Sequence, residues 1–276
     1  MKTLRDKKLK RLQNVLKEME SAVIAYSGGV DSTFLLHTAR SVLGRANVLA
    51  VTASSESYPS SEMKIAKRLA QKMSTKHLII KTGELENADF RRNPVNRCYY
   101  CKKELFRKLN SIAKNKGFRY VLDGSTIDDL KDIRYGRTAA REENVKSPLQ
   151  EAGLDKKDVR QLSKRVHIEN WNKPAAACLA SRLAYNEPIT KERLKKVNAA
   201  EEFIRNFGFN QVRVRRHRNI ARIEIANKDI RRFLKRGVKN SIFRKLRSLG
   251  FVYVTLDIEG YRTGSMHEEL DSSPLT

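Results

Sequence analysis

Three cysteines and one pair of adjacent glycines are the residues of this chain whose types and spacing can do chemistry. Cys98 and Cys101 form a CxxC motif in NRCYYCKKELF, and Cys178 stands far downstream in KPAAACLASR. The number of cysteines is odd and the basic N-terminus lacks a secretory signal, which argues against a disulfide framework and predicts reduced thiols. A lone CxxC motif is then either a redox pair or half of a zinc site.

The number of cysteines also limits what they could bind. Structural zinc usually takes four protein ligands, so a histidine such as His167 would have to complete the set, and nothing in its spacing points to that role. Three thiolates instead suit a [4Fe-4S] cluster that keeps one iron open for a non-protein ligand. The plain alternative is that the three cysteines are small buried apolar side chains.

Gly28 and Gly29 lie in the segment SGGVDS, between the apolar run AVIAY and the helical pattern TFLLHTARSVL. A tight turn at that boundary places consecutive backbone N–H groups at the N-terminus of a helix, where the partial positive charge attracts phosphate. The string matches neither of the familiar glycine-rich patterns, GxxxxGKS/T and GxGxxG. A glycine pair taken alone is often only a turn, so the rest of the segment has to carry the assignment.

The elements that must position these residues alternate between short β-rich runs and amphipathic helices. Strands are predicted at 21–27, 47–54, 76–82 and 120–125, and helices at 4–19, 32–43, 60–73 and 101–116. This alternation predicts an α/β fold in which helices cover both faces of a parallel sheet. Ligands of such sheets bind at the carboxyl ends of the strands.

A different pattern begins near residue 185 and predicts a smaller C-terminal α+β domain. It consists of a helix within 187–208, strands at 210–217 and 221–225, helices at 228–237 and 241–250, and a last strand at 251–259. Antiparallel pairing is expected for these strands. The two domains are predicted to be residues 1–180 and 181–276.

The charge of the chain is strongly positive. Lys and Arg number 57 against 31 Asp and Glu, for a net charge of +26, which favours phosphorylated ligands or polyanionic partners, although a solvated basic surface would look the same. In VRVRRH, Arg213 and Arg215 share one face of a predicted strand and form a potential phosphate clamp. No apolar run approaches the roughly 18 residues of a membrane span, and a cytoplasmic location is expected.

The complete string Ser27, Gly28, Gly29, Val30, Asp31 and Ser32 resembles the pyrophosphate loop of the ATP pyrophosphatase (PP-loop) superfamily. These proteins have an adenine nucleotide alpha hydrolase-like fold and cleave ATP between its α and β phosphates to adenylate a substrate. The resemblance implies that the loop holds the pyrophosphate, that Asp31 helps place Mg²⁺, and that adenine lies near Ala25 and Ser54. Further contacts to nucleotide, Mg²⁺ or phosphates are predicted for Gly124, Asp128, Arg134 and Arg141.

Motifs from both predicted domains resemble the LarE family of ATP-dependent sulfur transferases, over residues 15 to 268. They are SGGVDS, NPVNRCYYCK, VLDGSTIDD, RTAAREENVKSPLQEAGL, KPAAACLASRLAY, VRVRRH, ARIEI and GYRTGSMHE. The family helps to make the nickel-pincer nucleotide cofactor of lactate racemase. The resemblance implies that ATP adenylates a carboxylate of pyridinium-3,5-biscarboxylic acid mononucleotide and that sulfur then displaces AMP, giving a thiocarboxylate. Adenylation suits the task because a carboxylate is otherwise a poor electrophile.

Two sources of sulfur are found in that family. Members with a single cysteine at the position of Cys178 give up its sulfur and become dehydroalanine, whereas members with three cysteines are thought to carry an extra sulfide on a [4Fe-4S] cluster. This chain has the second pattern, which implies that Cys98, Cys101 and Cys178 are catalytic cluster ligands and that the enzyme turns over repeatedly. A sacrificial Cys178 is the alternative, and the sulfide donor is not identified.

The resemblance also implies a substrate site in the C-terminal domain. Arg213 and Arg215 would bind the substrate phosphate, Ser181 and Arg182 would lie close to the reactive cysteine, and the acid of the site would be Glu201, with Glu202 the alternative. The same domain is expected to support a homo-oligomer.

Two other functions compete with this interpretation. A tRNA thiolase of the same superfamily would also adenylate its substrate, use a CxxC plus a distant cysteine, and need a basic surface. The absence of zinc-knuckle cysteines and the family-specific GYRTGSMHE segment count against it. A non-catalytic regulatory protein that senses ATP is the third hypothesis, and it gives the three cysteines no purpose.

Overall fold

The computed structural model describes residues 2–130, 135–174, 176–262, 265–266 and 268. The chain divides into two compact units, of which unit 1 comprises residues 1–90 and 95–176, and unit 2 comprises residues 91–94 and 177–276. The sequence placed the division after residue 180, so the structure differs in two ways. Cys178 belongs to unit 2, and four residues that precede the CxxC motif also belong to unit 2.

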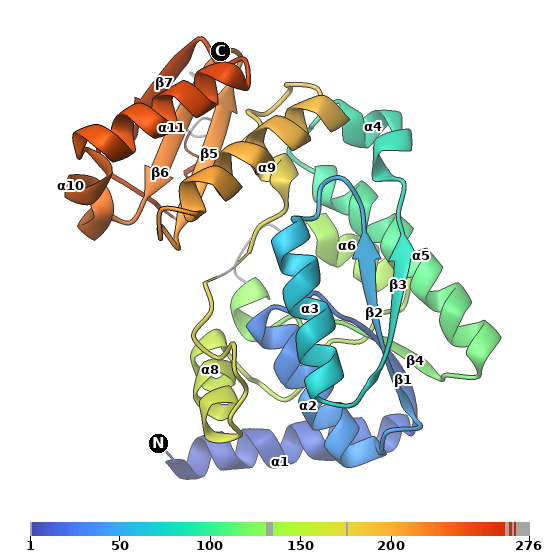
Figure 1. Cartoon of the computed structure of the whole chain (residues 1–276). Coiled ribbons are helices and arrows are strands. Elements are labelled where there is room, and N and C mark those ends of the chain that lie inside the picture. The colour runs from blue at the N-terminus through green and yellow to red at the C-terminus, as the bar shows by residue number, and fades with distance from the viewer. Residues whose placement is uncertain (1, 131–134, 175, 263–264, 267, 269–276) are drawn as a thin grey trace. The chain divides into compact units, whose positions relative to one another are not determined.

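Unit 1 is built on a sheet of four parallel strands with helices around it (Figure 1). The strand order is β3-β2-β1-β4, and every neighbouring pair is parallel. This confirms the predicted α/β fold. The strands are β1 (Ala22–Ala25), β2 (Val48–Ser54), β3 (Lys76–Lys81) and β4 (Tyr120–Leu122).

Apolar side chains cover both faces of this sheet because successive residues of a strand point to opposite sides. Ile24 belongs to a core that also contains Leu16 and Leu35, contributed by α1 and α2. Its neighbour Val23 belongs to the other core, which contains Leu109 of α5. The helices before residue 176 are α1 (Lys2–Met19), α2 (Val30–Leu43), α3 (Ser60–Lys72), α4 (Ala88–Arg91), α5 (Arg97–Lys116), α6 (Tyr135–Glu142), α7 (Pro148–Glu151) and α8 (Lys156–Arg165).

Unit 2 contains a three-stranded sheet in the order β5-β6-β7. β5 (Val212–His217) and β6 (Ile220–Ile225) are antiparallel, whereas β6 and β7 (Tyr253–Leu256) are parallel. The expectation of antiparallel pairing throughout is therefore wrong for β7. The chain between β6 and β7 is a crossover that contains α10 (Ile230–Phe233) and α11 (Arg236–Ser248), and a crossover returns a strand in the parallel sense. The helix α9 (Lys191–Arg205) precedes the sheet.

Residues 91–94 are held in unit 2 by Asn93, whose side chain is fully buried. Its amide donates a hydrogen bond of 2.7 Å to the carbonyl of Ala184, and its own carbonyl accepts one of 3.1 Å from Asn186 N. Ile189 N also donates to the carbonyl of Arg91. The segment that carries the CxxC motif therefore starts directly from the unit that carries Cys178. Among the described residues, no helix combines the length and the apolar character needed to cross a membrane.

Candidate functional site

The SGGVDS segment forms the turn between β1 and α2, at the carboxyl edge of the sheet. Gly29 is the N-cap residue of α2 and offers no side-chain acceptor to the first turn. The leading N–H groups of a helix have no intrahelical partner, so those at the start of α2 are positioned to bind an anion. α2 has 14 residues and is buried on most sides, including five consecutive positions from Ser32 to Leu36, which holds this N-terminus in place.

Hydrogen bonds within the segment fix its shape. The Ser32 hydroxyl lies 3.1 Å from the Ser27 hydroxyl and donates to the carbonyl of Gly29 at 3.2 Å. Gly28 has a φ of +64°, and a Cβ there would come within 2.9 Å of the Ala66 Cα. Glycine is required at this position both for its left-handed conformation and for the closeness of α3.

Two residues that sequence reasoning missed hold this loop from outside. Tyr58 donates its hydroxyl to the carbonyl of Ser27 at 2.7 Å, and the buried Asn170 donates its amide to the carbonyl of Gly28 at 2.9 Å. Burial raises the pKa of Tyr58, so its hydroxyl stays protonated as a donor. No motif or spacing marks either residue, because both reach the loop through tertiary packing.

The other residues predicted for the nucleotide site are distributed as follows. A Cβ on Gly124 would lie 2.9 Å from Ser32 N, so the chain after β4 packs directly against the loop. Ala25 and Ser54 are half-buried at the carboxyl ends of β1 and β2. Asp128 accepts a hydrogen bond of 2.7 Å from Lys156 N, and Arg141 is exposed on α6. Arg134 lies outside the described residues.

The structure also identifies a buried carboxylate beside Gly124. Asp123 accepts hydrogen bonds from the hydroxyls of Ser125 and Ser147, both at 2.7 Å. Lys102, the residue after Cys101, has its ammonium 3.9 Å from the same carboxylate. This acid at the end of β4 was not singled out in the sequence, because an aspartate after a strand is common in turns.

Cys98 and Cys101 lie one helical turn apart in the first turns of α5, and Cys98 is exposed. Cys178 is exposed as well, and it is the residue that precedes the short 3-10 helix η3 (Leu179–Arg182). Within the described part of the chain, no three His, Cys, Asp or Glu side chains gather as a metal-binding group. Cysteine thiols are nevertheless the usual ligands of iron-sulfur clusters, and this chain has three of them, two of which are exposed.

The backbone of Cys178 is held by the residues that follow it. Its carbonyl accepts a hydrogen bond of 2.8 Å from the Ser181 hydroxyl and one of 3.1 Å from Arg182 Nη1. The same Arg182 nitrogen donates to the carbonyl of Ala177 at 3.0 Å. Arg182 is only 1% exposed, so it holds the cysteine segment from the protein interior, whereas Cys178 itself is exposed to solvent.

Arg182 is in turn fixed by a fully buried carboxylate on α9. Glu201 accepts hydrogen bonds from Arg182 Nε at 2.7 Å, from Arg205 Nη2 at 2.6 Å and from Val214 N at 3.1 Å. Burial raises the pKa of Glu201, but the charges of Arg182, Arg205 and Arg213 outweigh it and leave the pKa below its usual value. Glu201, one of the two glutamates that the sequence left open, contacts two arginines of this site directly.

Arg213 and Arg215 lie on the same face of β5, as predicted, and both are buried. Arg215 forms a two-pronged ion pair with Glu224 at 3.1 and 2.9 Å and donates to the carbonyl of Ser181 at 2.9 Å. Arg213 packs over the ring of Tyr261 at 5.3 Å. Burial, followed by the charge of Arg182, lowers the pKa of Arg213 to about 10.

This arginine cluster, which consists of Arg182, Arg205, Arg213 and Arg215 around Glu201 and Glu224, holds more positive than negative charge in a mostly buried setting. An anion such as a phosphate would relieve that imbalance. The protein thus combines, in its two units, a helix N-terminus suited to phosphate and an arginine cluster bonded to the backbone of an exposed cysteine.

The chain is similar over much or all of its length to several known proteins. Residues 6–113 match the NAD synthase family. A pyridinium-3,5-bisthiocarboxylic acid mononucleotide synthase of Lactiplantibacillus plantarum is 40% identical over 275 residues, which cover 100% of this chain and 99% of that protein. Uncharacterized proteins of Synechocystis sp. and Methanocaldococcus jannaschii are 42% and 32% identical, over 96% and 93% of this chain and 98% of each of those proteins.

The fold and the glycine loop define the chain as a PP-loop protein. Because the chain is 40% identical to the Lactiplantibacillus plantarum synthase over its whole length, it belongs to the LarE family within this class. It is accordingly an enzyme.

Proposed function

We propose that the protein is an ATP-dependent sulfur transferase that inserts sulfur into pyridinium-3,5-biscarboxylic acid mononucleotide during synthesis of the nickel-pincer nucleotide. The related enzyme of Lactiplantibacillus plantarum carries the name of the bisthiocarboxylic product. One observation supports the proposal most strongly. The carbonyls of Cys178 and Ser181 accept hydrogen bonds from Arg182 and Arg215, which belong to the arginine cluster.

The chain's residues suggest how the first half-reaction is organised. The N–H groups at the start of α2 hold the β and γ phosphates of ATP, with Mg²⁺ near Asp31. The substrate carboxylate attacks the α phosphorus, pyrophosphate leaves, and an acyl adenylate forms. Asn170 and Tyr58 contribute by fixing the carbonyls of Gly28 and Ser27, which keeps the loop in its anion-binding shape.

The second half-reaction requires the substrate to stay close to the sulfur source. In this proposal Arg213 and Arg215 bind the phosphate of the substrate while Arg182 keeps the Cys178 segment in position. Sulfur attacks the activated carbonyl carbon, AMP leaves with the bonding electrons, and a thiocarboxylate results. A [4Fe-4S] cluster held by Cys98, Cys101 and Cys178 would supply a sulfide at its open iron.

Two findings support a joint role for the three cysteines. Residues 91–94 tie the start of the CxxC segment to unit 2, which also carries Cys178. All three side chains are thiols, and the two at Cys98 and Cys178 are exposed to ligands. A sacrificial Cys178 remains the competing source of sulfur, and the two are separated by experiment.

The first experiment is anaerobic purification followed by analysis of iron and acid-labile sulfide, on the wild type and on Cys178→Ala. About four irons per chain, lost in the variant, support the cluster. Absence of iron, together with a loss of about 34 Da at Cys178 after incubation with ATP and substrate, as removal of H₂S requires, would instead establish a sacrificial cysteine.

The substrate is tested by pyrophosphate release with the pyridinium mononucleotide, with tRNA and with neither. Arg213→Ala is expected to raise the KM for the mononucleotide roughly 10- to 150-fold, as loss of a charge-assisted hydrogen bond of about 1.5 to 3 kcal/mol predicts. Arg218→Ala, at an exposed arginine just beyond the same strand, is the matched control and should change it little. Stimulation by tRNA alone would favour a tRNA thiolase.

A further inference from the structure

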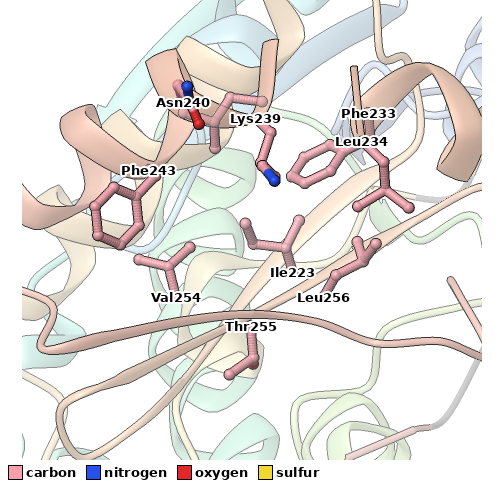
Figure 2. A pocket seen from close by; sticks show the side chains of 10 residues that line it. Ile223, Phe233, Leu234, Lys239, Asn240, Phe243, Val254, Thr255 and Leu256 are labelled. Atoms are coloured by element: carbon pink, nitrogen blue, oxygen red, sulfur yellow. The ribbon is translucent and has the colours of Figure 1, made fainter. Parts of the chain in front are cut away.

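A pocket of about 270 Å³ opens in unit 2 between the β6–β7 edge of the sheet and the helices α10 and α11 (Figure 2). Its apolar lining includes Ile223, Phe233, Leu234, Phe243, Val254 and Leu256. Because side chains alternate along a strand, Ile223 faces this pocket while its neighbour Glu224 faces the arginine cluster. The pocket is therefore separate from the site described above.

Two of the apolar side chains that line the pocket are strongly exposed, and further exposed apolar side chains lie at the start of the neighbouring strand β7. Leu234 and Phe243 are 51% and 49% exposed, and Val252 and Tyr253, at the start of β7, are 45% and 63% exposed. β7 is also the last strand of its sheet, so only one of its edges pairs with another described strand. Exposed apolar groups gathered at a pocket and an unpaired strand edge are typical of a surface that binds another chain.

The stretch of chain that supplies all of the lining except Ile223, residues 233–256, carries positive charge only. The sequence contains no Asp or Glu between Ile230 and Leu256. The exposed cations of this stretch include Lys235, Arg236, Lys239 and Arg244, and none of these four forms an ion pair with a described carboxylate. Figure 2 shows the Lys239 side chain extending over the apolar lining, with its ammonium group above Ile223.

We propose that this pocket docks an acidic segment of a partner protein, with an aliphatic or aromatic side chain in the pocket and carboxylates against Lys235, Arg236, Lys239 and Arg244. The four exposed cations favour a negatively charged partner, which is why we infer an acidic segment. A second copy of this chain would bring the same cations, on a protein of charge +26, against one another. An RNA strand would satisfy the cations but would leave the aliphatic lining unused.

The test uses the full chain and a short fluorescein-labelled peptide in which glutamates flank a central Leu-Phe pair. Fluorescence anisotropy without ATP should show saturable binding that weakens about tenfold or more in Lys239→Glu and in Leu234→Ser. Both residues are exposed and lie outside the catalytic machinery, so pyrophosphate release should not change. The control variant Lys7→Glu, with the same change of charge on an exposed lysine of α1, should bind as the wild type does.

Four results would overturn the proposal. The first is equal binding of a peptide in which Ser-Ser replaces Leu-Phe, because the pocket would then have no role. The second is weakening of the same size in Lys7→Glu, which would reveal unspecific attraction to the net charge. The third is a labelled single-stranded RNA that binds more tightly than the peptide and whose binding Leu234→Ser leaves unchanged. The fourth is a dimer in size-exclusion chromatography that Leu234→Ser abolishes, which would make a second copy the occupant. None of these results depends on the proposed sulfur transfer.

Discussion

Replacing Glu201 with glutamine should destabilise unit 2 strongly, because a single buried carboxylate holds several arginines. Gln keeps the size of the side chain and one acceptor oxygen, but it leaves Arg182, which is 1% exposed, without its counter-charge. Removing one partner of a buried ion pair costs about 3–5 kcal/mol. The remaining acceptor favours the lower value, about 3 kcal/mol. For a unit of roughly 100 residues this lowers Tm by roughly 12–24 °C.

The assay is thermal unfolding of the full chain, followed by near-ultraviolet circular dichroism, for Glu201→Gln and for Glu202→Gln. Glu202 is the next residue on the same helix and is only half-buried, so its variant should stay within about 1 kcal/mol of the wild type. Equal Tm values for the two variants would refute the reasoning, since Arg182 would then not depend on Glu201. Labelling of Cys178 by iodoacetamide should also change in Glu201→Gln, because Arg182 fixes the backbone of Cys178.

The same contact predicts a dependence on pH. The pKa of Glu201 in the folded protein lies below its usual value of 4.5, because the neighbouring arginines outweigh the effect of burial. A carboxyl group of this kind stabilises the fold above its unfolded pKa, and that contribution is lost as the pH falls through the folded pKa. The difference in Tm between the wild type and Glu201→Gln should therefore be largest near neutral pH and shrink below about pH 4.5.

The remaining predictions concern the phosphate loop. Gly28→Ala should lower the stability of unit 1 and raise the KM for ATP in pyrophosphate release, because its φ of +64° and the Ala66 backbone both oppose a Cβ; Gly117→Ala, with a φ of +73° and open space around it, should show the conformational cost alone, about 1 kcal/mol. Asn170→Ala should weaken ATP binding roughly fivefold in isothermal titration calorimetry, the equivalent of about 1 kcal/mol for the lost hydrogen bond to Gly28, and an unchanged affinity would mean that the loop keeps its shape without it.

Features that depend on local sequence could be predicted. The strand-turn-helix around SGGVDS follows from an apolar run, two glycines and a helical pattern that are adjacent in the chain. The shared face of Arg213 and Arg215 follows from the two-residue period of a strand. Both could be read from the sequence because they involve interactions over a few residues.

Features that depend on contacts between residues distant in the sequence could not be predicted in the same way. The parallel pairing of β7 is a consequence of how α10 and α11 pack, and the sequence pattern of a strand does not encode its direction. Asn170 reaches Gly28 across 142 positions, and Asn93 anchors a short segment to a unit built mainly from residues after 176. The periodic pattern of apolar residues in a sequence gives no information about contacts between residues so far apart in the chain.

The sequence by itself determined the chemistry available to this protein: a phosphate loop, three thiols and a basic C-terminal half. The tertiary structure decided which of these groups act together. It buried Arg182 and Glu201 as a pair beneath Cys178, and it left Lys239 above an apolar pocket. The physical reason is that burial and charge pairing are set by residues distant in the chain, whereas residue type and local conformation are set by neighbours.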